Sequence, residues 1–298
     1  SPSRTPKENH TQMKSLFSNP RVVFDGAMGT LLLEAGLPAG ASPDSWNITH
    51  PDRIRAIHRA YLEAGASVIT TNTFGSSKPR QKRGSYTPAQ LAEAGVKLAR
   101  EAADSFGKDC AVALDIGPLG EFIEPLGDLT EEEAIVLFRE PIEAGVAAGA
   151  DCILIETMCD LTEALCAVSA AKQYGGGLPV FCTLSYDPNG RLMTGVPLET
   201  VVAALEEAGV AALGCNCGVG PAQLVELLPR FTACARVPLL MQPNAGLPEF
   251  RDGQTVYLVE PEEYARLMKA LADGGVWGLG GCCGTTPAHI EALVASLG

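Results

Sequence analysis

The chain has 298 residues, of which 46% are hydrophobic and 19% charged, so it can bury a large core and is not intrinsically disordered. Its net charge of −13 at pH 7 argues against nucleic acid or an anionic membrane surface as a partner. The sequence shows no stretch of about 18 uncharged apolar residues and no secretory signal. We therefore expect a cytoplasmic protein that does not span a membrane.

The first 19 residues differ in character from the rest of the chain. They are polar and mixed, so we expect a flexible N-terminal leader at 1–19 and the folded part at 20–298. No linker or tandem repeat divides residues 20–298, which favours a single domain.

Eight short apolar runs follow the leader. Each is four to eight residues long and rich in Val, Ile, Leu or Cys without polar alternation, which is typical of strands buried on both faces. The runs are Val22–Asp25, Ser67–Asn72, Cys110–Ile116, Cys152–Glu156, Val180–Ser185, Ala212–Cys217, Pro238–Gln242 and Val276–Gly280.

Segments with a helical period separate these runs. The first three are predicted at 51–64, at 88–106 and after the capping box at 130–133. Pro141 lies inside the third segment, where we expect a kink or a break. The later helices are predicted to begin near Leu161, Leu198, Pro221, Pro261 and Pro287.

The alternation of eight strands with eight helices predicts parallel strands joined by right-handed crossovers. Eight such units in about 275 residues are typical of a (β/α)₈ barrel, the TIM barrel. A doubly wound open sheet is the alternative, but it rarely needs eight units in a chain of this size. Polar or reactive residues end each predicted strand, and barrel active sites form at that end.

Four of the ten cysteines, Cys215, Cys217, Cys282 and Cys283, stand apart from the others in glycine-rich surroundings. Cys217 ends the sixth predicted strand, and Cys282 and Cys283 follow the eighth, so their thiolates can meet at one metal ion. Three soft sulfur ligands with one open position are typical of a catalytic zinc site. A redox-active dithiol, or inert cysteines near the rim, are the alternatives. Cys215 points to the opposite face of its strand from Cys217 and is expected to pack in the core.

Two carboxylates also end apolar strands. Asp25 and Glu156 are costly to bury unpaired, so each is expected to bind a substrate ammonium, act as acid or base, or hold a neighbouring loop. Asp115 precedes a Gly-Pro pair and is interpreted as a residue that holds a turn. The sequence has no Walker loop and no GxGxxG after a strand, so nucleotide chemistry has no support.

Several motifs together resemble the homocysteine S-methyltransferase family. They run in order over residues 22–298, and they are most similar to the N-terminal homocysteine-binding module of cobalamin-dependent methionine synthase. The matching motifs are FDGAMGT (24–30), TNTF (71–74), DIGP (115–118), ET (156–157), GCNC (214–217) with GP (220–221), PNAG (243–246) and GGCCGTTP (280–287).

The resemblance implies a (β/α)₈ barrel that holds Zn²⁺ through Cys217, Cys282 and Cys283. It implies that Asn244 occupies the fourth zinc position when substrate is absent. It also implies that Asp25 and Glu156 face the substrate amino group, while backbone amides of Gly26, Ala27 and Met28 receive its carboxylate. Zinc would remove the proton from the homocysteine thiol, which then attacks a methyl group and gives L-methionine.

The sequence motifs do not identify the methyl donor. Methylcobalamin is expected, but the chain has no Asp-x-His-x-x-Gly motif for it and no second barrel for a folate. The cobalamin would then arrive on another domain or on a corrinoid protein, with a folate domain if the chain is a module of a larger enzyme. One alternative is direct use of a small sulfonium or betaine donor. The other is a zinc-dependent thiol-binding module without turnover.

Overall fold

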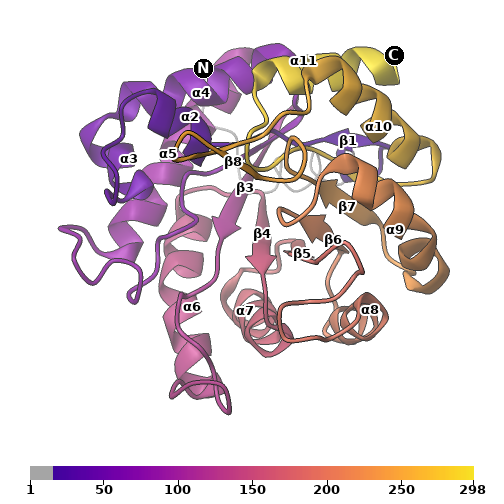
Figure 1. Ribbon diagram of the computed structural model, residues 1–298. Coiled ribbons are helices and arrows are strands. Elements are labelled where there is room, and N and C mark those ends of the chain that lie inside the picture. Colours follow the sequence, from indigo (N-terminus) through magenta and orange to yellow (C-terminus); the bar gives the residue numbers. More distant parts are fainter. Residues whose placement is uncertain (1–15) are drawn as a thin grey trace.

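The structure of the protein, a computed structural model, describes residues 16–298 (Figure 1). The predicted leader at 1–19 therefore lies almost entirely outside the described residues. Within its last four residues, the Phe17 ring packs edge-on against Phe181, with the ring centroids 5.1 Å apart. The described chain thus already contacts the folded core before residue 20.

Eight parallel strands form one sheet. They are β1 (Val22–Val23), β2 (Val68–Thr70), β3 (Ala111–Ile116), β4 (Cys152–Met158), β5 (Val180–Leu184), β6 (Ala212–Asn216), β7 (Leu239–Gln242) and β10 (Gly278–Leu279). Their order in the sheet is β1-β10-β7-β6-β5-β4-β3-β2. A bridge between Phe24 and Val68 joins the two ends of that order, where the Asp25 N–H donates to the Val68 carbonyl at 3.0 Å. The sheet closes, which confirms the predicted (β/α)₈ barrel and excludes the open doubly wound sheet.

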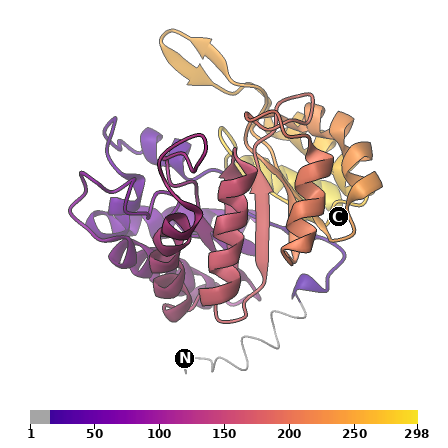
Figure 2. The same ribbon diagram turned by 90° about the horizontal axis from the view of Figure 1, so that it is seen from below.

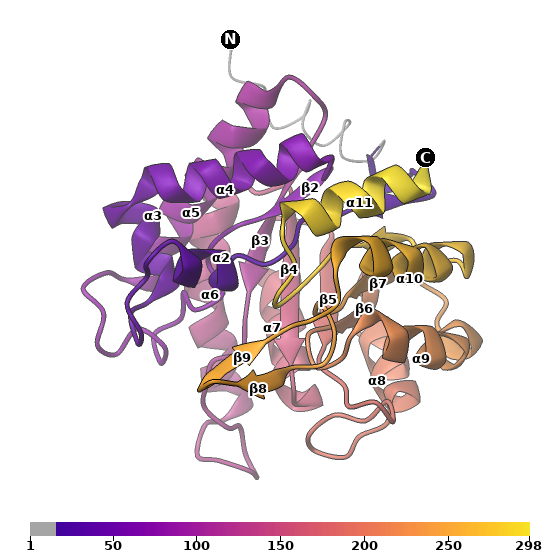
Figure 3. The ribbon, with the colours of Figure 1, turned by 45° about the horizontal axis from the view of Figure 1, so that its top comes forward.

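A ring of helices surrounds the strands (Figure 1). The helices that follow the eight strands are α4 (Pro51–Ala64), α5 (Pro88–Phe106), α6 (Glu131–Ala147), α7 (Leu161–Tyr174), α8 (Leu198–Glu207), α9 (Pro221–Cys234), α10 (Pro261–Asp273) and α11 (Pro287–Leu297). All eight begin where the sequence predicts. α11 lies between α4 and α10 (Figure 3), so the last unit of the barrel packs against the first. None of the helices in residues 16–298 combines the length and hydropathy that a bilayer crossing needs.

Three features differ from the prediction or extend it. No break interrupts α6 at Pro141: the cost of an internal proline, about 3 kcal/mol, is offset because Phe138 and Ile142 bury against the core. Two short helices, α2 (Gly29–Glu34) and α3 (Trp46–Thr49), precede α4 and are too short to show a helical period.

An exposed hairpin, β8 (Glu249–Arg251) and β9 (Gln254–Val256), projects from the barrel (Figure 2). The sequence analysis did not predict it. Asp252 and Gly253 form its turn with φ of 49° and 79°, and an Asp-Gly pair is the usual sequence signal for such a turn. The sequence contains this turn signal, but the flanking residues are charged and do not show the apolar pattern from which the other strands were predicted.

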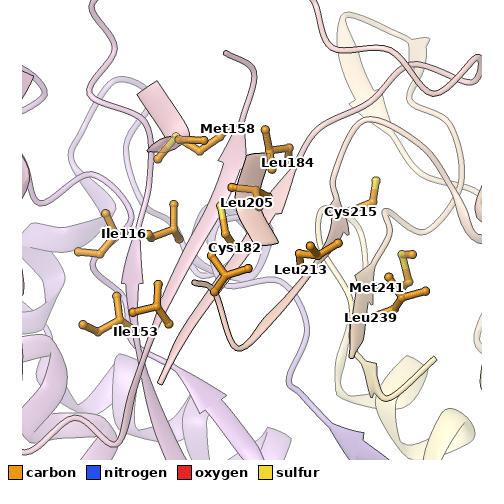
Figure 4. Close-up of a cluster of buried hydrophobic side chains, with 14 of the residues drawn as sticks. Ile116, Ile153, Met158, Cys182, Leu184, Leu205, Leu213, Cys215, Leu239 and Met241 are labelled. Atoms are coloured by element: carbon orange, nitrogen blue, oxygen red, sulfur yellow. The ribbon is translucent and has the colours of Figure 1, made fainter. Parts of the chain in front are cut away.

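Strand side chains alternate between the barrel interior and the surrounding helices. Phe24, Phe181 and Trp277 pack together inside the barrel, beside Phe17. The outward-facing side chains form a second apolar layer against the helices, part of which Figure 4 shows. Cys215 belongs to this second layer and is fully buried, as predicted.

Candidate metal and substrate site

A cavity of about 890 Å³ lies at the C-terminal ends of the strands. Its wall is formed by residues at or just after the C-terminal ends of β1, β2, β3, β4, β6, β7 and β10. Eight of the nine residues predicted for the site line this single cavity: Asp25, Gly26, Ala27, Met28, Glu156, Cys217, Cys282 and Cys283. Asn244, the ninth, contacts Cys217 through its side chain.

The three thiols form one compact group. The Sγ atoms of Cys217, Cys282 and Cys283 all lie within 4.8 Å of one another, and each residue is half-buried. In residues 16–298 this is the one group of three or more Cys, His, Asp or Glu side chains close enough to hold a metal ion. The predicted meeting of the β6 and β10 ends is therefore confirmed.

Strand β7, which lies between β6 and β10, holds both cysteine loops in place. The Cys217 N–H donates to the Gln242 carbonyl at 3.2 Å, and the Cys282 N–H donates to the Pro243 carbonyl at 2.9 Å. Cys217 adopts a left-handed conformation with φ of 58°, which is strained for a residue with a side chain. The next residue is Gly218, with φ of 69°, where an added Cβ would lie 2.5 Å from the Ser185 Oγ. The tight turn that aims Cys217 at the other thiols thus requires glycine.

Hydrogen bonds within the group favour one thiolate. The thiols of Cys282 and Cys283, the Gly218 N–H and the Asn244 amide all donate to Cys217, and they lower the pKa of this thiol to about 3. The same hydrogen bonds, together with burial, raise the pKa of Cys282 and Cys283. The group therefore concentrates negative charge at a place where a bound cation would be stabilised. The Asn244 Oδ1 is buried without a hydrogen-bond partner in the described residues.

Asn216 connects the thiols to the neighbouring strands, a role that the sequence analysis missed. Its Oδ1 accepts hydrogen bonds from the Thr157 N–H and the Thr183 hydroxyl, both at 2.7 Å. Its Nδ2 donates to the Thr157 hydroxyl at 2.6 Å and to the Cys282 Sγ at 3.8 Å. Thr157 is another left-handed residue, with φ of 60°, and Asn216 satisfies its amide. A polar residue between two cysteines of an otherwise apolar strand was the available signal.

Asp25, which follows β1, is anchored in the wall of the same cavity. Its two carboxylate oxygens accept hydrogen bonds from the Thr70 N–H at 2.8 Å and the Thr70 hydroxyl at 2.9 Å. Burial nevertheless raises the pKa of Asp25 to about 7. Asp25 thus holds the end of β2 and also faces the cavity.

Asp115 does not hold a turn, contrary to the interpretation from the sequence. It is the fifth residue of β3, its side chain lines the cavity, and it is hydrogen-bonded to the Glu156 carboxyl. Burial is the main cause that raises the pKa of both carboxyls. The strand predicted at 110–116 already includes Asp115, but the Gly-Pro pair after it suggested a turn because the sequence does not show that its side chain meets Glu156 on β4.

The backbone at 26–28 is partly engaged within the protein. The Ala27 N–H donates to the Thr285 Oγ1 at 3.0 Å, and the Ala27 carbonyl accepts from the Tyr61 hydroxyl at 2.5 Å. The amides of Gly26 and Met28 have no such partner in the described residues. These contacts fix the loop after β1 and leave two amides for a ligand.

The family model for homocysteine S-methyltransferase matches residues 22–297, nearly the whole described chain. The chain belongs to the homocysteine S-methyltransferase family. The match spans every strand and helix of the barrel and both cysteine loops. The three thiols and the carboxyls of the cavity all lie within the matched residues.

Two methionine synthases are similar to this family member. That of Mycobacterium tuberculosis is 34% identical over 305 residues, which cover 96% of this chain and 25% of the relative. That of Mycobacterium leprae is 33% identical and covers 93% of this chain and 24% of the relative. The chain thus spans about a quarter of the length of these relatives.

The solved structures of the homocysteine methyltransferase MmuM from Escherichia coli share the fold. The metallated form superposes with a TM-score of 0.81 at 24% identity and covers 95% of this chain and 99% of MmuM. The apo form has a TM-score of 0.74 at 26% identity, with 96% and 99% coverage. A barrel of this size therefore occurs as a nearly complete chain in MmuM and matches a quarter of each mycobacterial relative.

Proposed function

We propose that the protein is a zinc-dependent methyltransferase that moves a methyl group to the thiol of L-homocysteine and forms L-methionine. The observation that carries this proposal is the convergence of Cys217, Cys282 and Cys283 in one cavity that the carboxyls of Asp25, Asp115 and Glu156 also line. Membership of the homocysteine S-methyltransferase family supports the reaction class.

The donor set fits zinc. Three thiols within one ligand sphere favour a soft or borderline ion over magnesium or calcium, and the cavity leaves a side of the group open to a further ligand. Asn244 is proposed as the fourth ligand without substrate, because its amide already contacts Cys217 and its Oδ1 has no other partner. For this, the Asn244 side-chain amide would have to flip, so that its Oδ1 rather than its Nδ2 faces the metal ion.

Zinc bound by the three cysteines would act as a Lewis acid that lowers the pKa of the substrate thiol, which is about 8.5 for a free alkyl thiol. The chain's own residues supply the rest. Buried carboxyls bind the ammonium end of the amino acid, and the free amides of Gly26 and Met28 receive its carboxylate. These contacts orient the sulfur toward the cysteines. The strained Cys217 backbone, held by β7, keeps that direction fixed.

Methylcobalamin is the proposed donor, delivered by another domain or by a corrinoid protein. The support is the match to methionine synthases that are about four times as long as the matched segment. A cavity of about 890 Å³ is at the upper end of the range of roughly 300–1,000 Å³ for drug-sized ligands, so one small amino acid does not fill it. The remaining space is where the donor methyl group would approach.

The test is methionine formation by the zinc-loaded protein from L-homocysteine and free methylcobalamin, followed by the cobalamin absorbance change. We expect turnover that stops when a chelator removes zinc and returns when zinc is restored. No turnover with methylcobalamin, but turnover with a sulfonium or betaine donor, would replace the donor and keep the acceptor. Homocysteine binding without product from any of these donors would show a binding module instead.

A further inference from the structure

Thr285 is a fully buried residue that joins the loop after β1 to the loop after β10. Its hydroxyl accepts a hydrogen bond from the Ala27 N–H at 3.0 Å and donates one to the Cys282 carbonyl at 2.7 Å. Ala27 and Cys282 both line the cavity, whereas Thr285 does not. A single hydroxyl behind the cavity wall therefore connects the first strand unit of the barrel to the last.

Glycines flank this hydroxyl on both loops. A Cβ added at Gly26 would lie 2.7 Å from the Thr285 Oγ1, and one added at Gly281 would lie 2.4 Å from the same atom. The Gly281 N–H also donates to the Asp25 carbonyl at 3.0 Å. The two loops thus pack against each other at the Thr285 hydroxyl, with no room for a side chain on either glycine.

The hydrogen bond to Ala27 fixes the backbone that is proposed to receive the substrate carboxylate. The Ala27 N–H has no other acceptor in the described residues, and it lies between the free amides of Gly26 and Met28. Loss of the Thr285 hydroxyl would leave a buried N–H unpaired, which costs free energy unless the loop moves. Either response changes the direction of the neighbouring amides.

The hydrogen bond to Cys282 acts on the thiol group in the same way. The Cys282 carbonyl accepts from both the hydroxyl and the N–H of Thr285, the latter at 3.1 Å. These two bonds hold the turn from which the Cys282 and Cys283 side chains reach the Cys217 Sγ. Groups that orient metal ligands from behind commonly change metal affinity when they are removed.

We propose that Thr285 is a positioning residue that aligns the carboxylate subsite with the metal site. This inference rests on the proposed function and adds a residue that touches neither ligand. The thiol and the carboxylate of one homocysteine molecule are a fixed number of bonds apart, so both ends bind well only if the two loops keep their relative position. The Thr285 hydroxyl provides that connection.

The test uses two thiols that differ only in the carboxylate, L-homocysteine and 3-aminopropane-1-thiol. Calorimetry at saturating zinc measures both affinities, and competition with a chromogenic chelator measures zinc affinity. We expect Thr285→Val to reduce the preference for homocysteine roughly threefold to tenfold. Its zinc affinity should fall about tenfold. Thr285→Ala is the second variant, measured in the same way if the Val variant does not fold.

Two control variants separate positioning from stability. Thr285→Ser keeps the hydroxyl, so both quantities should stay within twofold of the wild-type values. Thr286→Val removes the neighbouring hydroxyl, which contacts the His289 Nδ1 at 2.9 Å at the start of α11 and neither loop. We expect it to lower the melting temperature and to leave both quantities unchanged.

Three results would overturn the inference. If Thr285→Val melts at a lower temperature but keeps both quantities, Thr285 has a structural role only. If it loses the preference or the zinc affinity alone, the hydroxyl does not align the two sites. If Thr285→Ser loses as much as Thr285→Val, the hydroxyl is not responsible. Failure of the proposed carboxylate subsite is distinguishable, because the wild-type protein would then show no preference for homocysteine, and the inference would fall with it.

Discussion

The two sides of the cavity are built differently. On the thiol side, three Sγ atoms lie within 4.8 Å of one another and share hydrogen bonds. On the carboxyl side, Asp25 follows β1, Asp115 and Glu156 lie in β3 and β4, and the three do not converge to the distances of metal ligands. A metal ion demands close convergence of its ligands, whereas an ammonium group accepts a wider arrangement. We therefore propose metal binding on one side and amino-acid recognition on the other.

The largest effect is expected from Cys217→Ala. Loss of one of three thiolate ligands should remove bound zinc and reduce methyl transfer more than a thousandfold, because the substrate thiol would stay protonated. Cys215→Ala is the matched control, since Cys215 lies two residues before Cys217, within β6, but packs against the helices. Metal analysis and methionine formation measure both variants. Wild-type zinc content in Cys217→Ala would break the assignment of the thiol side.

Glu156→Gln tests whether the carboxyl side acts independently of the metal. We expect the KM for homocysteine to rise roughly tenfold to a hundredfold because an ammonium contact loses its charge. Zinc content should not change. Glu163→Gln is the control, a buried glutamate outside the cavity that accepts from the Leu119 N–H at 2.6 Å. A loss of zinc in Glu156→Gln, but not in the control, would mean that the two sides are not separate.

Asn216→Ala addresses the connection between the two sides. The variant removes the donor to the Cys282 Sγ and the acceptor for the Thr157 amide, so zinc affinity should fall about tenfold. The free energy of unfolding should fall by about 1–3 kcal/mol. Thr183→Val removes only one donor to Asn216, and we expect it to lower stability without a change in zinc affinity. Competition with a chromogenic chelator measures the affinity, and equal losses in both variants would contradict a direct effect on Cys282.

The smallest effect is a pH dependence from Asp25. Its pKa in the folded protein, about 7, is above the ordinary value of 3.8 because of burial. Asp25 therefore contributes to the stability of the ligand-free protein most fully below pH 3.8. That contribution is lost as the pH rises through about 7.

The affinity for an ammonium group changes with pH in the opposite direction to this stability, because the ammonium binds the ionised carboxylate. The affinity for L-2-aminobutyrate, which has no thiol, should therefore rise severalfold between pH 6 and pH 8. Calorimetry at the two pH values measures the change, and Asp25→Asn should flatten it. An affinity that falls with rising pH would contradict the placement of the ammonium beside these carboxyls.

The sequence predicts the barrel and the thiol side well for physical reasons. Buried parallel strands are continuous apolar runs, and capping residues mark helix starts such as those after Thr87 and Thr130. The carboxyl side was predicted only in part. The role of the Asp115 side chain depends on its contact with Glu156 on the neighbouring strand β4, and the network of Asn216 depends on contacts across four strands. Such long-range contacts leave no local pattern in the chain.

The most direct measurement is the number of protons released when L-homocysteine binds to the zinc-loaded protein at pH 6.5. Calorimetry in buffers of different ionisation enthalpy gives this number, and L-2-aminobutyrate corrects for protons released by the carboxyls. We expect close to one additional proton for homocysteine and none from the protein without zinc, because the thiol binds deprotonated. No additional proton with the zinc-loaded protein would contradict activation of the thiol at the three cysteines.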